Sequence, residues 1–274
     1  MIFYFSATGN SLWTARQIGG MLSDSVYNLI EAASTNETYT LQKNESVGFV
    51  FPVHAWGVPR TVIKCMRNLH FTHKPDYVYF ICTCGDDTGK TASVFIRECQ
   101  HCGWECNAGF SVIMPNTYVC LPGFDTDDPE VEHEKLNQMS GRIKNITTNI
   151  HNRICLFDCK EGTIPWIKTY LIQPLFNWFL MSPKWFRSLD TCISCGICEK
   201  VCPSKNIYME NGKPKWGKQC TMCLACYHHC PKHAIDYARQ TKAKGQYTMP
   251  FLSKKTHIVT PENEKKGQID YLLR

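Results

Sequence analysis

Residues 192–203 read CISCGICEKVCP, and residues 220–231 repeat the same cysteine spacing as CTMCLACYHHCP. Each run has the form Cys-x2-Cys-x2-Cys-x3-Cys-Pro, and the second begins 28 residues after the first. A short loop with three evenly spaced thiols can wrap an iron–sulfur cubane. Paired Cys-x2-Cys hooks also suit tetrahedral zinc. Zinc sites rarely carry a third evenly spaced cysteine and a Cys-Pro in tandem, so the repeat favours two [4Fe-4S] clusters.

This spacing resembles that of two-cluster bacterial ferredoxins over about residues 184–238. The resemblance implies low-potential, one-electron transfer, with the fourth cysteine of each run bound to the cluster of the other run. We therefore expect cluster one to use Cys192, Cys195, Cys198 and Cys230, and cluster two to use Cys220, Cys223, Cys226 and Cys202. His228 and His229 lie within the second run; they could raise a cluster potential, but we expect ordinary loop histidines.

Length and composition indicate a two-domain globular protein. The 274 residues suit two modest domains, and 43% apolar with 20% charged residues disfavours both disorder and a membrane bundle. The chain begins with a short apolar run that lacks the basic flank and long core of a signal peptide. Seventeen cysteines without such a signal indicate metal ligands in a reducing, cytoplasmic compartment, not disulfides.

The charge is unevenly distributed. Residues 1–183 hold 14 Lys and Arg against 17 Asp and Glu, whereas residues 184–274 hold 16 against 7. A basic half is typical of nucleic-acid binding. Here, however, the same half carries the eight cysteines, whose thiolates would make bound clusters anionic, so the excess charge neutralises them and no nucleic-acid partner is expected.

The first 115 residues alternate apolar, β-rich runs with helical stretches. Strands are expected over residues 2–5, 26–30, 47–51, 77–82 and 109–114, and helices over 10–22, 58–69, 88–99 and 129–151. This order predicts an α/β fold with a doubly wound, five-stranded parallel sheet. Such sheets bind ligands beyond the carboxyl ends of their strands, so the loops after strands one, three and four are the first candidate site.

The loop after strand one resembles the phosphate loop of flavodoxins. It contains Ser6, Thr8, Gly9, Asn10 and Ser11. The resemblance implies that hydroxyls, the Asn side chain and amides at a helix N-terminus surround the phosphate of FMN without a lysine. Taken alone the signal is weak, because any turn from strand to helix favours such residues.

Two further loops occupy the positions that flank the isoalloxazine ring in flavodoxins. The first contains Pro52, Val53, His54, Ala55, Trp56 and Gly57, and the second contains Thr83, Cys84, Gly85 and Asp86. Trp56 is expected to cover one ring face, and the backbone of the second loop to approach the other. Tyr118, after strand five, is another stacking candidate, with edge-of-core packing as the alternative for both aromatics.

Three other stretches of the sequence resemble functional motifs or membrane segments. The stretch from Gly85 to Thr91 is not a Walker A loop, because three residues instead of four separate its glycines. Cys99, Cys102 and Cys106 are interpreted as packing thiols, with a third metal site as the alternative. The aromatic stretch of residues 164–186 is interrupted by Lys168, Gln173, Pro174 and Asn177. It therefore predicts a packed connecting segment and no transmembrane segment, with contact with a membrane surface as the alternative.

The order of these parts resembles the ferredoxin/flavodoxin fusion proteins found mainly in anaerobes. The resemblance implies an FMN domain over 1–152, a connector over 153–183, a small α+β domain with two [4Fe-4S] clusters over 184–240 and a basic, extended tail over 241–274. The cysteine in the loop after strand four and the basic second half depart from typical flavodoxins.

Joining flavin to clusters predicts an electron relay that couples one- and two-electron chemistry and serves a redox partner protein or a small acceptor. The alternative is an FMN-dependent reductase of a quinone or nitroaromatic, for which His54 is the candidate proton donor. Whether the chain is an enzyme or a carrier stays open at this level. A redox sensor lacks a second motif, and no Gly-x-Gly-x-x-Gly fingerprint supports direct use of NAD(P)H.

Overall fold

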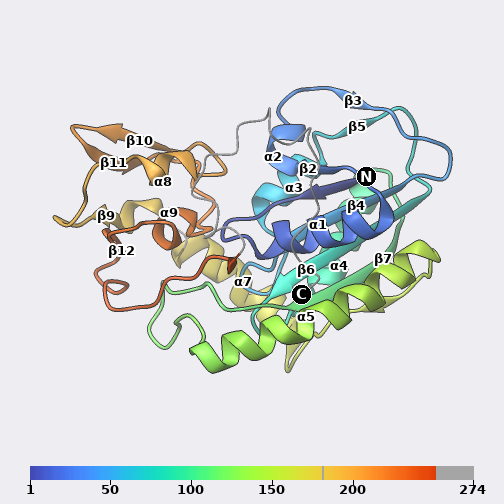
Figure 1. Ribbon diagram of the computed structural model, residues 1–274. Helices are drawn as coiled ribbons and strands as arrows, with labels where there is room; N and C mark the ends of the chain where they lie inside the picture. Colours follow the sequence, from blue (N-terminus) through green and yellow to red (C-terminus); the bar gives the residue numbers. More distant parts are fainter. Residues whose placement is uncertain (181, 251–274) are drawn as a thin grey trace.

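The computed structural model describes residues 1–180 and 182–250. Figure 1 shows two lobes side by side: a larger sheet lobe, built from residues 1–158, and a smaller cysteine lobe, built from residues 186–237. Residues 159–185, here called the connector, join them. The chain is therefore a mixed α/β protein with a small second unit that contains both cysteine runs.

The sheet lobe is organised by one six-stranded parallel sheet with the order β2-β1-β4-β6-β7-β8. Its strands are β1 (Ile2–Tyr4), β2 (Val26–Asn28), β4 (Ser46–Pro52), β6 (Tyr77–Cys84), β7 (Cys106–Ile113) and β8 (Phe157–Asp158). The first five follow the chain order 2-1-3-4-5 of flavodoxin-like sheets, so the architecture is compatible with that fold. The sequence predicted five strands; β8 is an addition, and it escaped prediction because it is two exposed residues long.

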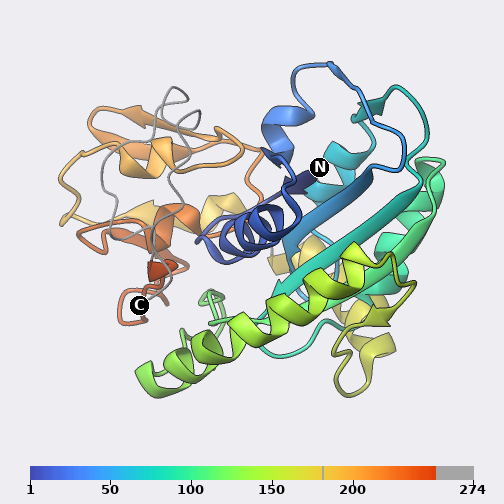
Figure 2. The same ribbon diagram turned by 45° about the vertical axis from the view of Figure 1, so that its right-hand side comes forward.

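Helices cover both faces of this sheet (Figures 1 and 2). Along β4, Phe49 and Phe51 pack into the core that holds helices α3 (Arg60–Met66) and α4 (Thr91–His101), whereas Val50 packs into the core of the opposite face. That opposite core holds α1 (Asn10–Leu22) and α5 (Pro129–His151). Successive strand residues point to opposite faces, so a nearly continuous apolar run is what a doubly covered strand requires.

Two predicted helices are shorter or shifted in the structure. The first was expected from residue 58 but starts at Arg60, and the second was expected from residue 88 but starts at Thr91. Gly89 has a φ of +55°, a left-handed conformation that ends the loop before α4 can begin. The remaining small elements of this lobe are α2 (Leu29–Ala32) and the parallel pair β3 (Thr38–Tyr39) and β5 (His70–Phe71).

In the cysteine lobe, the strands that flank one cysteine run pair with the strands that flank the other. It contains β9 (Phe186–Ser188), α8 (Ile197–Lys200), β10 (Ile207–Glu210), β11 (Lys213–Trp216), α9 (Ala225–His228) and β12 (Ile235–Tyr237). The strand before the first cysteine run, β9, pairs antiparallel with β12, the strand after the second run. Likewise β10, after the first run, pairs with β11, before the second. Each half of the repeat is therefore completed by the other half.

The two lobes share a hydrophobic core. Val119 and Cys120, from the loop between β7 and α5, are buried among Ile207, Tyr227 and Ile235 of the cysteine lobe. Lys244 fixes the same loop, because its Nζ donates to the carbonyl oxygens of Val119, Leu121 and Phe124 at 2.6–2.7 Å. The lobes are consequently packed as one body and not joined by a loose linker.

The first residues of the predicted tail also pack against both lobes. The Tyr247 hydroxyl donates to Asn10 Oδ1 at 2.8 Å, and the Met249 amide donates to the carbonyl of Thr8 at 2.8 Å. Tyr247 and Met249 are buried. The rest of the predicted tail, residues 251–274, lies outside the described residues.

The connector runs as one helical segment of α and π turns, through α6 (Pro165–Ile167), η1 (Lys168–Ile172), α7 (Gln173–Leu175) and η2 (Phe176–Leu180), and then a 3-10 turn η3 (Pro183–Trp185). Within residues 1–180 and 182–250, none of the helices is long and apolar enough to cross a membrane.

An ion pair between a buried carboxylate and a partly exposed arginine in the cysteine lobe gives a stability prediction. Asp236 is fully buried, accepts two hydrogen bonds from Arg187 at 2.6–2.8 Å and accepts another from the Thr241 amide. Asp236→Ala should lower the free energy of unfolding by about 2 kcal/mol, because these donors lose a charged acceptor. Anaerobic urea unfolding measures the change.

The matched control is Glu210→Ala in the same lobe. Glu210 lies 3.8 Å from Lys215, and both side chains are more than half exposed. Such exposed pairs contribute little, so the loss should stay within about 0.5 kcal/mol. Equal losses for the two variants would contradict the role given to Asp236.

Candidate functional site

The eight cysteines of the two runs form two groups in the structure. Burial of Cys198 and, to a smaller extent, the nearby thiols of Cys195, Cys230 and Cys192 together raise the pKa of its thiol to about 11. The first group thus joins three cysteines of the first run with the last cysteine of the second. The last cysteine of one run thus joins the first three of the other, because the strand pairing of the lobe brings the two runs together.

The second group has the reciprocal composition. Burial raises the pKa of the Cys226 thiol well above its usual value, and Cys223, Cys220 and Cys202 add to the effect. Burial likewise raises the pKa of Cys220 to about 12, with Cys223 and Cys202 as neighbouring thiols. Clustered thiols that oppose each other's ionisation suit a cationic iron centre, which needs them as thiolates.

The loops around both groups have the same backbone conformation. Ser194 and Gly196 have φ values of 59° and 71°, and Met222 and Leu224, at the equivalent places of the second run, have 53° and 62°. The left-handed residues turn each loop sharply between its cysteines. Only one of the four is glycine, so the repeat holds three side chains in a conformation that they rarely adopt.

Backbone amides point at the last thiol of each run. The Asn206 amide lies 3.3 Å from Cys202 Sγ, and the Ala234 amide lies 3.2 Å from Cys230 Sγ. Hydrogen bonds to sulfur stabilise thiolate ligands and tune the potential of a cluster. This donor set and the shape of the loops fit [4Fe-4S] clusters.

Among the described residues, no three His, Cys, Asp or Glu side chains converge on a point that would hold one metal ion. The thiolates of a cubane each bind a different iron atom and need not converge in this way.

The two groups differ in their surroundings. Cys195, in the first group, is exposed to solvent. Cys223, in the second group, packs against the hydrophobic core of the sheet lobe formed by residues such as Phe5 and Phe51. The second group therefore faces the carboxyl edge of the sheet, and the first is turned toward solvent.

The predicted phosphate loop lies at that edge, between β1 and α1. Gly9, the residue before α1, has a φ of 105°, and its amide donates to Ser6 Oγ at 3.2 Å. The first amides of any helix lack intrahelical acceptors and carry the positive end of its dipole. Because Gly9 adds no capping side chain, this turn suits a bound anion.

Other polar residues of this loop brace it instead of pointing outward. Thr8, Asn10 and Ser11 are buried. Asn10 Nδ2 donates to the Pro115 carbonyl at 3.1 Å, and Ser11 Oγ lies 2.8 Å from Thr83 Oγ1 near the carboxyl end of β6. These side chains thus link the loop after β1 to the end of β6 and to the loop after β7.

Two histidines of the second cysteine run hold the phosphate loop and the β7 loop. His228 Nδ1 accepts from the Tyr247 amide at 3.1 Å, so its Nε2 carries the proton and donates to the Thr117 carbonyl at 2.7 Å. His229 Nε2 lies 3.2 Å from the Ala7 carbonyl. Burial lowers the pKa of His228 to about 4, so the ring is neutral. Neither bond goes to a cysteine; both connect the lobes.

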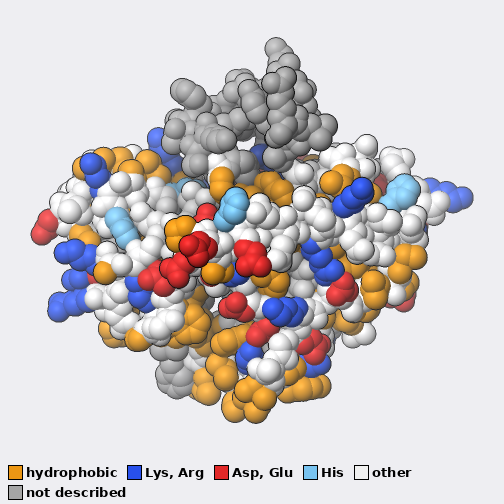
Figure 3. Space-filling view, turned by 60° about the horizontal axis from the view of Figure 1, so that its bottom comes forward, with side chains coloured by type: hydrophobic (Ala, Val, Ile, Leu, Met, Phe, Trp, Pro, Cys, Tyr) orange, Lys and Arg blue, Asp and Glu red, His pale blue; other side chains and the backbone are white. Residues whose placement is uncertain are grey.

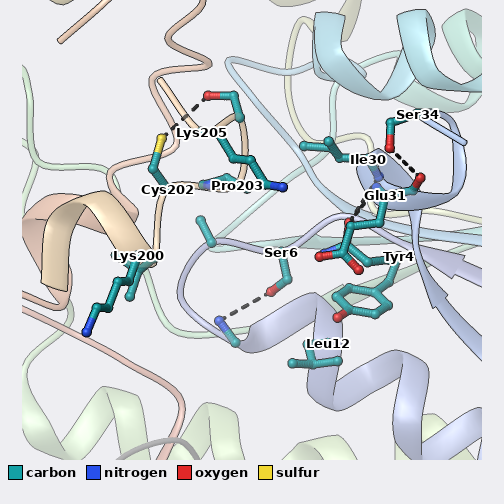
Figure 4. A pocket seen from close by; sticks show the side chains of 15 residues that line it. Tyr4, Ser6, Leu12, Ile30, Glu31, Ser34, Lys200, Cys202, Pro203 and Lys205 are labelled. Atoms are coloured by element: carbon teal, nitrogen blue, oxygen red, sulfur yellow. Dashed lines mark hydrogen bonds between the residues drawn. The ribbon is translucent and has the colours of Figure 1, made fainter. Parts of the chain in front are cut away.

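A pocket of about 350 Å³ opens where the phosphate loop meets the first cysteine run (Figure 4). The sheet lobe contributes Tyr4, Ser6, Ala7, Gly9, Leu12, Asn28, Ile30, Glu31 and Ser34, and the cysteine lobe contributes Lys200, Val201, Cys202, Pro203, Ser204 and Lys205. In Figure 4 the Lys205 side chain extends across the pocket, whereas Lys200 points away. Cys202, a member of the second thiol group, thus borders the same cavity as the phosphate loop.

The two predicted ring loops lie beside the phosphate loop but do not line this pocket. His54 and Gly57 form a tight turn in which Ala55 and Trp56 have φ values of 46° and 62°. The connector lies directly over this turn: Thr169 Oγ1 donates to the Trp56 carbonyl at 2.7 Å, and Lys168 Nζ lies 5.4 Å from the centre of the Trp56 ring.

The loop after β6 is also tightly packed, in this case against Asn116. A Cβ atom on Gly85 would lie 1.6 Å from Asn116 Oδ1, so only glycine fits there. Thr83 and Cys84, expected in this loop, are instead the buried last residues of β6, and burial raises the pKa of Cys84 to about 12. Pro52, expected in the loop after strand three, is instead the last residue of β4, whereas Val53 and Asp86 lie in the loops. The Val53 amide donates to the Thr83 carbonyl, which joins the two segments.

Tyr118 lies at the junction of the lobes. Its ring makes edge contacts with Phe124 and with Phe176 of the connector, at centroid distances of 5.5 and 5.6 Å. It packs against the core shared with the cysteine lobe and does not line the pocket. The structure thus places it between the connector and the cysteine lobe.

Sequence reasoning did not find the pocket residues Asn28, Glu31, Lys200 and Lys205. Asn28 and Glu31 lie far from Lys200 and Lys205 in sequence, and the two pairs meet only because the lobes dock, so no local pattern points to them. In the set Cys99, Cys102 and Cys106, the Cys99 thiol is hydrogen-bonded to Cys106, which together with burial raises its pKa.

Comparisons with known proteins identify one part of the chain. A family model described as a 4Fe-4S dicluster domain matches residues 191–235, which contain both cysteine runs. No curated protein and no solved structure matches the chain. The cysteine lobe is therefore an iron–sulfur, ferredoxin-like domain, and such a domain implies electron transfer.

Proposed function

We propose that the chain is a flavo-iron-sulfur electron relay of the ferredoxin/flavodoxin fusion type, in which electrons pass between two [4Fe-4S] clusters and FMN. One observation carries the proposal: Cys202 and the phosphate loop border the same pocket. A cofactor at the carboxyl edge of the sheet would thereby lie next to a cluster ligand, as efficient electron transfer requires.

Cluster one would be held by Cys192, Cys195, Cys198 and Cys230, and cluster two by Cys220, Cys223, Cys226 and Cys202. The proximity of the thiols within each set supports this assignment. The exposure of Cys195 favours cluster one as the entry or exit point for an external partner. Cluster two, which faces the sheet lobe, would exchange electrons with the flavin.

FMN, when bound, supplies a centre that accepts two electrons and releases them singly. The amides at the start of α1 and the Ser6 hydroxyl would hold its phosphate, and Lys205 would add a positive charge from the cysteine lobe. The loops at Trp56 and Gly85 would flank its ring. Binding of FMN would then depend on both lobes, because neither lobe alone provides this set of groups.

The relay is favoured over a reductase with its own proton donor. His54 was the candidate acid, but burial lowers its pKa to about 4. At pH 7 the imidazole is neutral and does not deliver a proton as an imidazolium. The electron partner would be a redox protein or a small acceptor.

Stopped-flow reduction under anaerobic conditions tests the relay. With a low-potential one-electron donor, the flavin should become reduced after the clusters. In Cys223→Ser, which disturbs cluster two, flavin reduction should slow by about tenfold or more, because the step into the flavin loses its donor. Reduced clusters beside a flavin that stays oxidised over long times would refute the relay, as would a chain that binds no FMN.

The exchange of the fourth cysteines gives a second test. Electron paramagnetic resonance of the reduced protein should give one signal for each cluster. Cys230→Ser and Cys198→Ser should both alter the signal of cluster one, and Cys202→Ser and Cys226→Ser should both alter the signal of cluster two. If the Cys230 variant instead shares its changed signal with the Cys226 variant, each run binds its own cluster and the assignment is wrong.

Gly85 provides a test of the flavin site alone. Gly85→Ala should weaken FMN binding by about tenfold or more, roughly 1.4 kcal/mol, because the new methyl group displaces Asn116 at the edge of the loop. Titration of flavin-free protein with FMN measures the affinity, and the iron content should not change. Gly20→Ala is the control, since a Cβ there meets nothing within 4 Å; equal affinities in the two variants would place the flavin elsewhere.

A further inference from the structure

The connector helix is amphipathic, but it exposes its apolar side and turns its polar side toward the protein. Its apolar residues Ile164, Ile167, Leu171, Leu175 and Trp178 recur every three or four positions and are 47–78% exposed. A surface helix normally buries such a stripe against the core. Figure 3 shows hydrophobic side chains gathered along one margin of the molecule.

The polar face of the same helix is bound to the sheet lobe. Lys168 Nζ forms an ion pair with Asp87 at 2.6 Å, and Thr169, which is 1% exposed, accepts a hydrogen bond from the Lys90 amide at 2.8 Å. The Gln173 amide lies against Gly57, where an added Cβ would come within 2.0 Å of it. These bonds fix the orientation, so the helix cannot simply roll over to bury its apolar stripe.

The exposed side also carries aromatic residues. Trp166 and Trp185 are 63% and 58% exposed, beside Trp178 at 78% and Tyr170 at 39%. Indole and phenol rings favour the boundary between lipid chains and water, because one part of the ring is apolar and the other is polar. Contiguous exposed apolar surface of this kind marks an interaction site.

The charge of the segment selects between kinds of partner. Between Glu161 and Asp190 the sequence contains no Asp or Glu; of its cations, Lys168 and Arg187 are paired with Asp87 and Asp236. Lys184 is exposed next to Trp185. Cations beside an apolar stripe complement anionic lipid headgroups. A second copy of the chain would instead bring equal charges together across a symmetric contact.

We propose that the exposed face of residues 164–178, together with Trp185, binds the surface of an anionic lipid bilayer, with the helix lying in the interface. The proposal rests on the connector alone and does not require the flavin. Since the polar face of this helix contacts the loops after β4 and β6, the same contact would hold those loops next to the membrane.

Vesicle co-sedimentation of the full chain, purified anaerobically with its clusters, tests the proposal. The protein should bind vesicles of phosphatidylglycerol and phosphatidylcholine at physiological salt, and tryptophan fluorescence should shift to shorter wavelength. Ile167→Glu combined with Leu171→Glu should reduce the partition coefficient by about tenfold or more, because two charges enter the apolar stripe. Both positions are exposed, so the fold should not depend on them.

The matched control is Met21→Glu combined with Val131→Glu, which places the same charges at exposed apolar positions on α1 and α5. This control should bind vesicles like the unchanged protein. Equal loss in both double variants, or no vesicle binding by the unchanged protein, overturns the proposal. A dimer that the connector variant converts to a monomer, without vesicle binding, would instead assign the face to a second copy.

Discussion

The structure depends on one insertion, that of the β7–α5 loop of the sheet lobe into the core of the cysteine lobe. Val119 and Cys120 are buried there, and Lys244 holds the carbonyls behind them. Separating the lobes would expose this apolar surface and leave three carbonyl groups without their charged donor. The lobes are therefore fixed relative to each other, and the pocket between Cys202 and the phosphate loop follows from that fixed arrangement.

The histidines of the second run also hold the lobes together, through hydrogen bonds across the junction. His228 and His229 reach from α9 and the residue after it to the loops after β7 and β1. Because His228 is neutral and hydrogen-bonded at both ring nitrogens, it joins the lobes without adding charge near the thiol groups. A cluster bound to the second run would thus be mechanically connected to the proposed flavin loop.

Much of this architecture follows from local sequence patterns. The alternation of apolar runs predicts the parallel sheet and the ends of α1 and α5, and the cysteine spacing identifies the iron–sulfur domain. The spacing does not reveal how the lobes dock, because Val119, Lys244 and Tyr247 belong to segments with no periodic signal. The orientation of the connector helix could not be predicted from the sequence either, because its apolar pattern is that of a buried helix. Only the bonds of Lys168 and Thr169 show that its polar face points toward the sheet lobe.

The central claim is that one chain holds both kinds of redox centre at this junction. Its most direct test is to purify the protein anaerobically and quantify iron, acid-labile sulfide and flavin, with an optical spectrum. The account predicts about eight iron atoms, a similar amount of sulfide and one FMN per chain. Zinc in place of iron, or clusters without flavin in protein that was never exposed to oxygen, would contradict it.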